Sequence, residues 1–433
     1  MSVDLKSLTE KVLALLKDRG ADMAYCTASQ SETREFNVDG GEFSLFRTLF
    51  DNSLSLTAFK DGKKGSVGIN RFDEASIEKA ADDCMTAVMS SSPDDAWALA
   101  PCAGERRFQT GELCPELDRL FDRTKELMDT VTEDFPKIVI EQMIVSHSKS
   151  HSVYRNTNGA CYIKDSGSYN AELMFSGHDG EAASSFFSSG VGCVDLEKPF
   201  IELGSIRQDL ADVEKQIHPS PADGKFTGVM VLTPASFASF MEDIIENFAA
   251  GTPVLEGTSI WRDKLDSQVA DERLTVSFCP SDTTMVASQS YTNEGFVTDD
   301  FDLIRNGVLK KFVIDLYVAN KTGLDRSENG GSNMIIAPGT KSIEEIISSI
   351  DRGIIVGRFS GGEPASSGDF SGVAKNSFLI ENGKIAGALS ETMISGNLNE
   401  MLMHLVELSK ERQSDGYTVL PYAAFDGITV SGK

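Results

Sequence analysis

Apolar and polar positions alternate along much of the first half of this chain, and stretches of helix-spaced apolar residues interrupt that alternation. Alternation is typical of strands with one buried face, while apolar residues three and four positions apart indicate an amphipathic helix. Glycine-rich turns separate the alternating runs, so antiparallel hairpins are expected. The elements predicted for the first half are a helix that ends at Gly20, hairpins over 23–70, helices over about 74–89 and 115–131 with a connecting loop at 92–113, and strands over 137–194.

The second half opens with a buried-strand pattern over 228–232. Thr233 can cap the helix that follows, and Pro234 suits its first position, where no backbone N–H is needed. Two Asn-Gly pairs between apolar runs, at 306–307 and 382–383, predict two-residue hairpin turns. A further short helix is expected at about 342–351. The helix that begins at Pro234 is predicted by an apolar stripe at helical spacing, which consists of Phe237, Phe240, Met241, Ile244, Ile245 and Phe248.

Residues 218–224 hold two prolines and a glycine within seven positions, a composition typical of a linker. We therefore expect two regions, an N-terminal one over 1–217 and a C-terminal one over 225–433. The predicted fold class is α+β. An N-terminal helix-and-hairpin domain is followed by a mostly antiparallel β C-terminal domain with a few helices.

The 433 residues carry a formal net charge of −26, and this charge changes what the chain is expected to bind. A field of that sign repels phosphate backbones, so nucleic-acid binding is not expected. The seven cysteines are scattered and never spaced C-x-x-C, which argues against a disulfide framework and a thiolate zinc cluster. Neither a signal peptide nor an apolar stretch of about 20 residues is seen, so we expect a cytoplasmic protein without membrane contact.

Side chains suited to catalysis are few. His147 and His151 are four positions apart, but the surrounding pattern predicts a strand, in which that spacing separates two residues by about 13 Å. We therefore expect two exposed strand histidines and no chelating pair.

Neither a G-x-S-x-G elbow nor a phosphate-binding loop occurs. The carboxylates of Glu242, Asp243 and Glu246 could hold a hard cation, although a solvated helix face is the simpler interpretation.

Several strings in the second half follow a distinctive order: NEGFVTDDFDLIRNGVLKKFVID from Asn293, GSNMIIAPG from Gly331, SGDFS from Ser367, then LIENGK and SGNLNEML. In this order they resemble the C-terminal domain of the TldD/PmbA family. Members of that family act in peptide maturation and proteolysis and carry the older name modulator of DNA gyrase. The strings SETREFNVDGGEFS and FKDGKKGSV resemble the N-terminal part of the family, so the resemblance covers most of the chain.

The metal-bearing, TldD-type members carry H-E-x-x-x-H on the helix after the first strand of their C-terminal domain, and a later cysteine completes their zinc ligands. Residues five apart lie about 140° around a regular helix, so that helix must deform to bring both histidines to one ion. At the matching positions this chain carries Glu242, Asp243 and Asn247, and no cysteine follows Cys279. The resemblance is therefore to the TldE/PmbA-type half of the family, and neither a catalytic residue nor a metal ligand is expected here.

The resemblance implies a non-metal subunit that pairs with a zinc-bearing TldD-type member, in a complex that cleaves unfolded or modified peptides. Zinc is then expected on the partner, and no cofactor on this chain. Two alternatives stay open: a homodimeric peptide-binding or regulatory protein without catalytic activity, and an enzyme that uses the acidic 242–246 cluster. The residues expected to contact an extended peptide or a partner are Asn293, Glu294, Gly295, Asn333, Ser367, Gly368, Asp369, Phe370 and Ser371.

Overall fold

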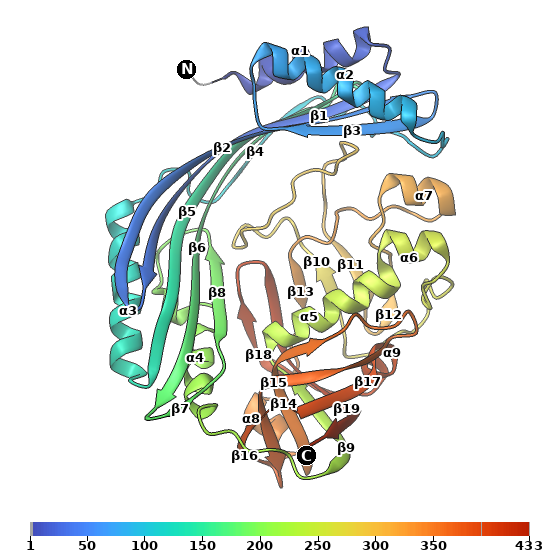
Figure 1. Ribbon diagram of the computed structural model, residues 1–433. Helices are drawn as coiled ribbons and strands as arrows, with labels where there is room; N and C mark the ends of the chain where they lie inside the picture. Colours follow the sequence, from blue (N-terminus) through green and yellow to red (C-terminus); the bar gives the residue numbers. More distant parts are fainter. Residues whose placement is uncertain (1–2, 391, 433) are drawn as a thin grey trace.

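A computed structural model describes residues 3–390 and 392–432 of the chain (Figure 1). Strands between Met23 and Cys193 form one β-sheet, and strands between Lys225 and Ser431 form a second. Helices pack on both sheets, and most neighbouring strands are antiparallel. The predicted α+β class is confirmed, with helices and hairpins first and a mostly antiparallel β domain second.

The first sheet is built from long strands. Its spatial order β3-β2-β1-β5-β6-β4 is antiparallel except for the pair β4–β6, and β7 and β8 also pair with β6. Because long strands twist, the sheet bends into a half-barrel whose concave side faces the second sheet (Figure 1). Its strands are β1 (Met23–Asp39), β2 (Glu42–Lys60), β3 (Lys63–Ile69), β4 (Glu105–Thr110), β5 (Ile138–Asn156), β6 (Cys161–Asp179), β7 (Ala182–Ala183) and β8 (Phe187–Cys193).

The helices of this half pack on the convex side of the sheet. Residues of even number in β1 share one face, and those near the two ends of the strand pack against helices. Ala24, Cys26 and Ala28 pack with the first two helices, whereas Val38 packs with the third and fourth. The concave side is left for the second half of the chain. The helices are α1 (Leu5–Asp18), α2 (Glu74–Ser90), α3 (Leu117–Asp134), the 3-10 turn η1 (Phe200–Glu202) and α4 (Ile206–Lys215).

The helices predicted near the N-terminus and at 74–89 and 115–131 are confirmed, but the connecting loop predicted at 92–113 is wrong in part. It contains β4, which pairs in parallel with β6 at the edge of the sheet. The strand carries Glu105, Arg106 and Arg107, and most of its side chains are exposed. An exposed edge strand has no apolar alternation, so its sequence resembles a loop.

The second sheet contains a closed ring of strands. β19 pairs with β17, β17 with β15, β15 with β14, β14 with β9, and β9 returns to β19. The pairs β9–β14 and β13–β19 are parallel. Strands β13, β10, β11 and β12 extend the sheet beyond the ring. The strands are β9 (Lys225–Leu232), β10 (Val276–Phe278), β11 (Phe301–Arg305), β12 (Val308–Leu309), β13 (Met334–Ile336), β14 (Arg352–Gly361), β15 (Asp369–Glu381), β16 (Lys384–Leu389), β17 (Thr392–Asn397), β18 (Leu405–Ser414) and β19 (Thr418–Ser431).

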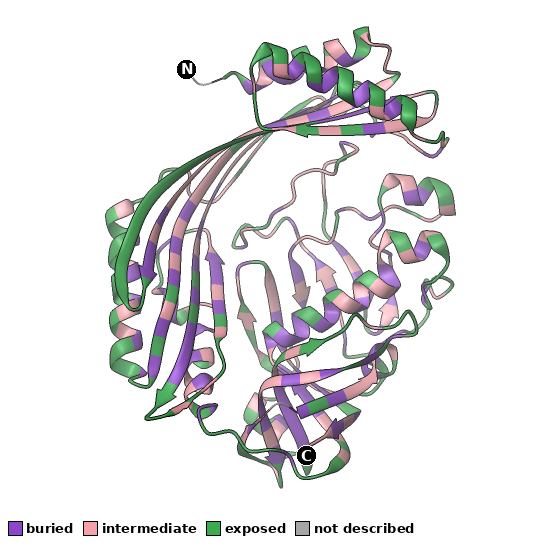
Figure 2. Cartoon of the chain, in the orientation of Figure 1, coloured by how far each residue is buried: buried purple, intermediate pink, exposed green. Residues whose placement is uncertain are grey.

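The helix cap and the two hairpin turns predicted in the second half are confirmed. Thr233 caps its helix by accepting a hydrogen bond of 3.3 Å from the backbone N–H of Ser236. Asn306 and Asn382 both take a φ of 50° in two-residue turns, as their Asn-Gly pairs predict. Buried positions are interspersed with half-buried and exposed ones along the strands of the ring (Figure 2), and the helix after Thr233 buries Phe237, Phe240, Met241 and Ile244 in the core. The helices are α5 (Pro234–Ile244), the π-helical turn η2 (Ile245–Ala249), α6 (Gly251–Glu256), α7 (Leu316–Thr322), α8 (Ile343–Ser348) and α9 (Leu398–Met403).

His147 is buried, which contradicts the prediction of two exposed strand histidines. Both histidines do lie on β5, and the His151 ring is exposed and lies 2.7 Å from a carboxylate oxygen of Asp165. The His147 ring nitrogen Nε2 lies 2.6 Å from the backbone oxygen of Glu112, and burial lowers the pKa of His147. The loop before α3 covers this part of the sheet. Because the contact joins residues far apart in the sequence, the alternation of the strand could not predict it.

Within residues 3–390 and 392–432, no helix has the length and apolar character needed to cross a membrane.

Candidate functional site

Helix α5 runs directly into η2, a π-helical turn, at the place where metal-bearing members are expected to carry their motif. The N–H of Ala250 donates to the carbonyl oxygen of Ile245 over 2.7 Å, which is an i→i+5 hydrogen bond. The helix is therefore widened just after its last regular turn, as two ligands five residues apart would require. In this chain the positions concerned hold Glu242, Asp243 and Asn247.

These three side chains do not fit a zinc ion. The Asn247 amide nitrogen Nδ2 donates to the backbone oxygen of Asp243 over 2.9 Å, so the amide is engaged within its own helix. Burial, together with repulsion from Glu246, raises the pKa of Glu242 and of Asp243. Across the part of the chain that the structure describes, no three His, Cys, Asp or Glu side chains are grouped to hold a metal ion.

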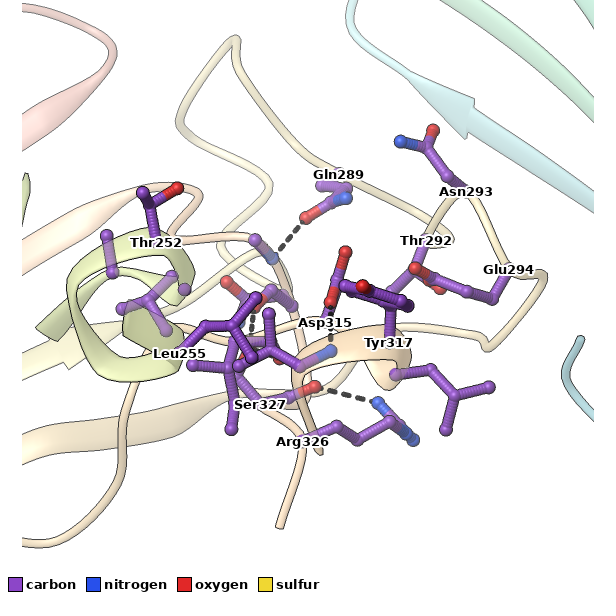
Figure 3. Close-up of a pocket in the computed structure, with 18 residues that line it drawn as sticks. Thr252, Leu255, Gln289, Thr292, Asn293, Glu294, Asp315, Tyr317, Arg326 and Ser327 are labelled. Atoms are coloured by element: carbon purple, nitrogen blue, oxygen red, sulfur yellow. Dashed lines mark hydrogen bonds between the residues drawn. The ribbon is translucent and has the colours of Figure 1, made fainter. Parts of the chain in front are cut away.

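A cavity of about 460 Å³ opens beside α6 and α7 (Figure 3). Asp315 starts α7 by accepting a hydrogen bond of 2.8 Å from the N–H of Val318. Arg326 stacks on the ring of Phe296, 3.6 Å from the ring centre, and burial lowers the pKa of Arg326. The cavity therefore combines acceptor oxygens with one half-buried cation. Its polar lining includes Thr252, Gln289, Thr292, Asn293, Glu294, Asp315, Tyr317, Arg326 and Ser327.

A second cavity, of about 440 Å³, shares Val313 and Gly330 with the first. We call the two together the groove. Glu242 and Glu246 line the second cavity, so the end of α5 forms one wall of the groove. Asn333 also lines it, and the Asn333 amide oxygen Oδ1 is buried without a hydrogen-bond partner. Neither histidine nor cysteine occurs among the residues that line the two cavities. The groove can thus bind polar groups, and its lining offers neither an imidazole nor a thiol.

The loop around Gly295 joins the groove to the half-barrel. The Tyr154 hydroxyl donates to the backbone oxygen of Asn293 over 3.0 Å, and the Tyr162 hydroxyl donates to that of Gly295 over 2.7 Å. Asn156 donates to the backbone oxygen of Glu294 over 3.4 Å. Three strand side chains thus hold three successive carbonyl groups, and the loop has little freedom to move against the first sheet.

Helix α7 makes a second junction with the half-barrel. Tyr317 stacks on Trp97 with ring centres 3.9 Å apart, and its hydroxyl donates to a carboxylate oxygen of Asp94 over 2.9 Å. Lys321 forms an ion pair of 2.9 Å with the same carboxylate. Backbone and side-chain hydrogen bonds, with this lysine, lower the pKa of Asp94. One wall of the first cavity is therefore fixed by contacts between the two halves of the chain.

The SGDFS segment lies apart from the groove. Asn397 caps α9 and donates to a carboxylate oxygen of Asp369 over 2.9 Å and to the backbone oxygen of Ser367 over 3.0 Å. The Ser367 hydroxyl donates to the other oxygen of Asp369 over 2.8 Å, and these bonds lower the pKa of Asp369. Gly368 has a φ of 92° and lies tightly against Phe248. The polar groups of this segment mainly satisfy one another, as a structural turn requires.

The structure therefore divides the predicted peptide-contact residues into two sets. Asn293, Glu294 and Asn333 line the groove, and Gly295 follows Glu294 in the loop that Tyr162 binds. Ser367 and Gly368 lie in the turn before β15 and Asp369–Ser371 at the start of that strand, where Asp369 and Phe370 line a different cavity. Sequence reasoning missed Gln289, Asp315, Tyr317 and Arg326. The run from Asp315 to Gly323 carries the cap and stop signals of a helix, and these could have directed attention to α7.

Known proteins resemble this chain in sequence and in fold. The family model described as PmbA/TldA metallopeptidase C-terminal domain matches residues 227–432, and the model for PmbA/TldA metallopeptidase domain 1 matches residues 28–88. The structure of TldE from Thermococcus kodakarensis superposes with a TM-score of 0.84 at 21% identity, over 98% of this chain and 100% of that one. A Bacteroides thetaiotaomicron structure whose title calls it a candidate modulator of DNA gyrase gives a TM-score of 0.87 at 22% identity, with both chains covered completely. These structures share the fold.

Two relatives of known family are similar to the chain in sequence. Metalloprotease PmbA of Escherichia coli O157:H7 is 25% identical over 426 residues, which is 92% of this chain and 89% of that protein. A zinc metalloprotease TldD homologue of Saccharolobus solfataricus is 24% identical over 282 residues, 60% of this chain and 61% of that protein. With both family models and these relatives in agreement, the chain belongs to the PmbA/TldD family.

Proposed function

We propose that this chain is the non-metal, TldE/PmbA-like subunit of a TldD/TldE-type metallopeptidase complex that acts on unfolded or modified peptides. One observation carries the proposal. A π-helical turn follows α5 where the family's metal motif is expected, but the positions concerned carry Glu242, Asp243 and Asn247, which do not group around an ion. The partner is a zinc-bearing TldD-type member, and the catalytic zinc belongs to it.

On this proposal the chain binds and positions the peptide. An extended peptide exposes backbone N–H and C=O groups along its length, and a groove with both acceptors and donors can pair with them. Glu242, Glu246 and Glu294 supply acceptors, and Arg326 supplies donors. The first cavity is lined by Asn293 and Tyr317, which hydrogen-bond to the first half of the chain, so this part of the groove is held open before the peptide arrives.

The proposal predicts where zinc is found. We expect the purified chain alone to bind less than about 0.1 zinc per chain and to leave a denatured peptide uncut, because its α5 offers no ligand set. Mixed with the metal-bearing member from the same organism, it should co-elute as a complex that holds one zinc per pair. Size-exclusion chromatography with metal analysis of each peak measures both. One zinc per chain on the isolated protein, together with peptide hydrolysis, would contradict the proposal.

A further inference from the structure

Two glutamates that line the second cavity have no partner of opposite charge. Glu242 and Glu246 lie four positions apart across the junction of α5 and η2, so they share one side of the helix and repel each other. Among the described residues, neither carboxylate forms an ion pair or a hydrogen bond. The charged groups that influence Glu242 are Glu246, Asp243 and Asp415, and all of them are negative. This end of the groove therefore carries a negative charge that the described chain does not balance.

A buried amide oxygen in the same cavity also lacks a donor. Asn333 lines the second cavity and is only 3% exposed. Its amide nitrogen Nδ2 donates to the backbone oxygen of Cys279 over 3.2 Å, whereas its amide oxygen Oδ1 is buried without a hydrogen-bond partner. Buried acceptors in folded proteins are almost always paired, so this exception is explained if a ligand supplies the donor. The two carboxylates and the amide oxygen are three acceptors of one cavity, and none of them has a donor.

Most of the other side chains that line the second cavity are apolar. They include Ile245, Phe278, Val313 and Met334, and the lining contains no lysine, arginine or histidine. A lysine or arginine side chain suits such a site, because its aliphatic stem packs on apolar groups while its charged end donates several hydrogen bonds. The volume of about 440 Å³ leaves room for a side chain of this length.

We propose that the second cavity binds a lysine or arginine side chain of an extended peptide, with the charged end of that side chain at Glu242, Glu246 and Asn333. The inference rests on the proposed function, because it names the kind of peptide that the groove selects. A metal ion fits less well, since hard cations take about six to eight oxygen ligands and no three acidic side chains are grouped among the described residues. The net charge of −26 also attracts cationic peptides from a distance.

Two labelled peptides of one unstructured sequence test the proposal by fluorescence anisotropy with the purified chain. One carries a single central lysine, and the other carries norleucine there, which has the same aliphatic stem without the charge. The lysine peptide should bind at least about fivefold more tightly. The double variant Glu242→Gln/Glu246→Gln should lose this preference, because both charged acceptors are gone. These substitutions remove a repulsion between like charges, so the variant should stay folded.

The matched control is the double variant Glu256→Gln/Asp263→Asn. Both residues are exposed on or just after α6, and neither lines the groove. The control removes the same amount of charge near the groove and should keep the preference for lysine. Equal binding of the two peptides to the wild type would overturn the proposal. So would a preference that survives in Glu242→Gln/Glu246→Gln, or one that the control loses equally. One calcium ion bound per chain and lost in Glu242→Gln/Glu246→Gln would show a metal site instead.

Failure of this inference can be told apart from failure of the proposed function. If both peptides bind equally well while the two chains still co-elute and cleave peptide, only the selectivity is wrong. If the chains do not co-elute but the preference for lysine depends on Glu242 and Glu246, the cavity binds as proposed and only the subunit role is wrong. If neither peptide binds, the inference is overturned together with peptide binding by the groove.

Discussion

Replacing Gly295 with alanine is expected to lower the free energy of unfolding by about 2–4 kcal/mol. Gly295 has a φ of 100°, a region that an alanine enters only with strain. A methyl group there would lie 2.6 Å from the Asn156 amide nitrogen and 2.8 Å from the Tyr154 hydroxyl. The loop must shift to relieve these contacts. Such a shift would stretch the hydrogen bonds that hold it to the half-barrel.

Gly323→Ala provides the matched control. Gly323 also has a positive φ, 75°, but a methyl group there meets no atom within 4 Å. Gly323→Ala should therefore lower the free energy of unfolding only by the backbone strain, about 1–2 kcal/mol. Urea unfolding of the wild type and both variants gives the difference. Equal losses at the two positions would show that the tight contact between loop and half-barrel contributes little to stability.

A second large effect is expected at Asp209, at the start of α4. Asp209 lines a small cavity between α4 and the second half of the chain, and the hydroxyls of Ser189 and Ser205 each donate to it over 2.6 Å. Burial raises the pKa of Asp209 to about 6, and repulsion from Asp212 adds to the rise. The hydrogen bonds from the two serines oppose this rise but do not cancel it. Between pH values near 3.8 and 6 the folded protein therefore keeps a proton on Asp209 that the unfolded chain releases.

The sign of the pH dependence follows from this proton. Between pH values near 3.8 and 6 the folded state binds more protons than the unfolded state, so the stability contributed by protonated Asp209 is lost as the pH rises. Relative to Asp209→Asn, the free energy of unfolding of the wild type should fall by about 2 kcal/mol from pH 4 to pH 7. Urea unfolding at several pH values measures it. A difference that stays constant, or rises with pH, would show that Asp209 is not buried as a neutral acid.

Local signals predicted the turns and caps well, because each depends on a few neighbouring residues. Asn306 and Asn382 mark their turns by tolerating a positive φ, and Thr233 caps α5 with its own side chain. The curvature of the half-barrel and the closure of the ring depend on pairs of strands far apart in sequence. The parallel pairing of β4 with β6 and the burial of His147 depend in the same way on long-range contacts.

The candidate site was predicted in part for the same reason. The sequence itself shows that no histidine stands at positions 242 and 247 of this chain. The five-residue spacing of the metal motif predicts that the helix which carries it is deformed. The π-helical turn η2 lies at that place. The grouping of Asn293, Glu294 and Asn333 in one groove could not be read from the sequence, since distant loops and the half-barrel hold them together. Arg326 was missed because its contact with Phe296 spans thirty positions.

The most direct test of the proposed subunit role is a cleavage assay with an unstructured peptide. The metal-bearing family member from the same organism is assayed alone and with increasing amounts of this chain. We expect the cleavage rate to rise at least about tenfold and to saturate at equal amounts of the two chains. A chelator should abolish the activity of the mixture. If the metal-bearing member cleaves equally well alone and the two chains do not co-elute, this chain is not a subunit of the peptidase.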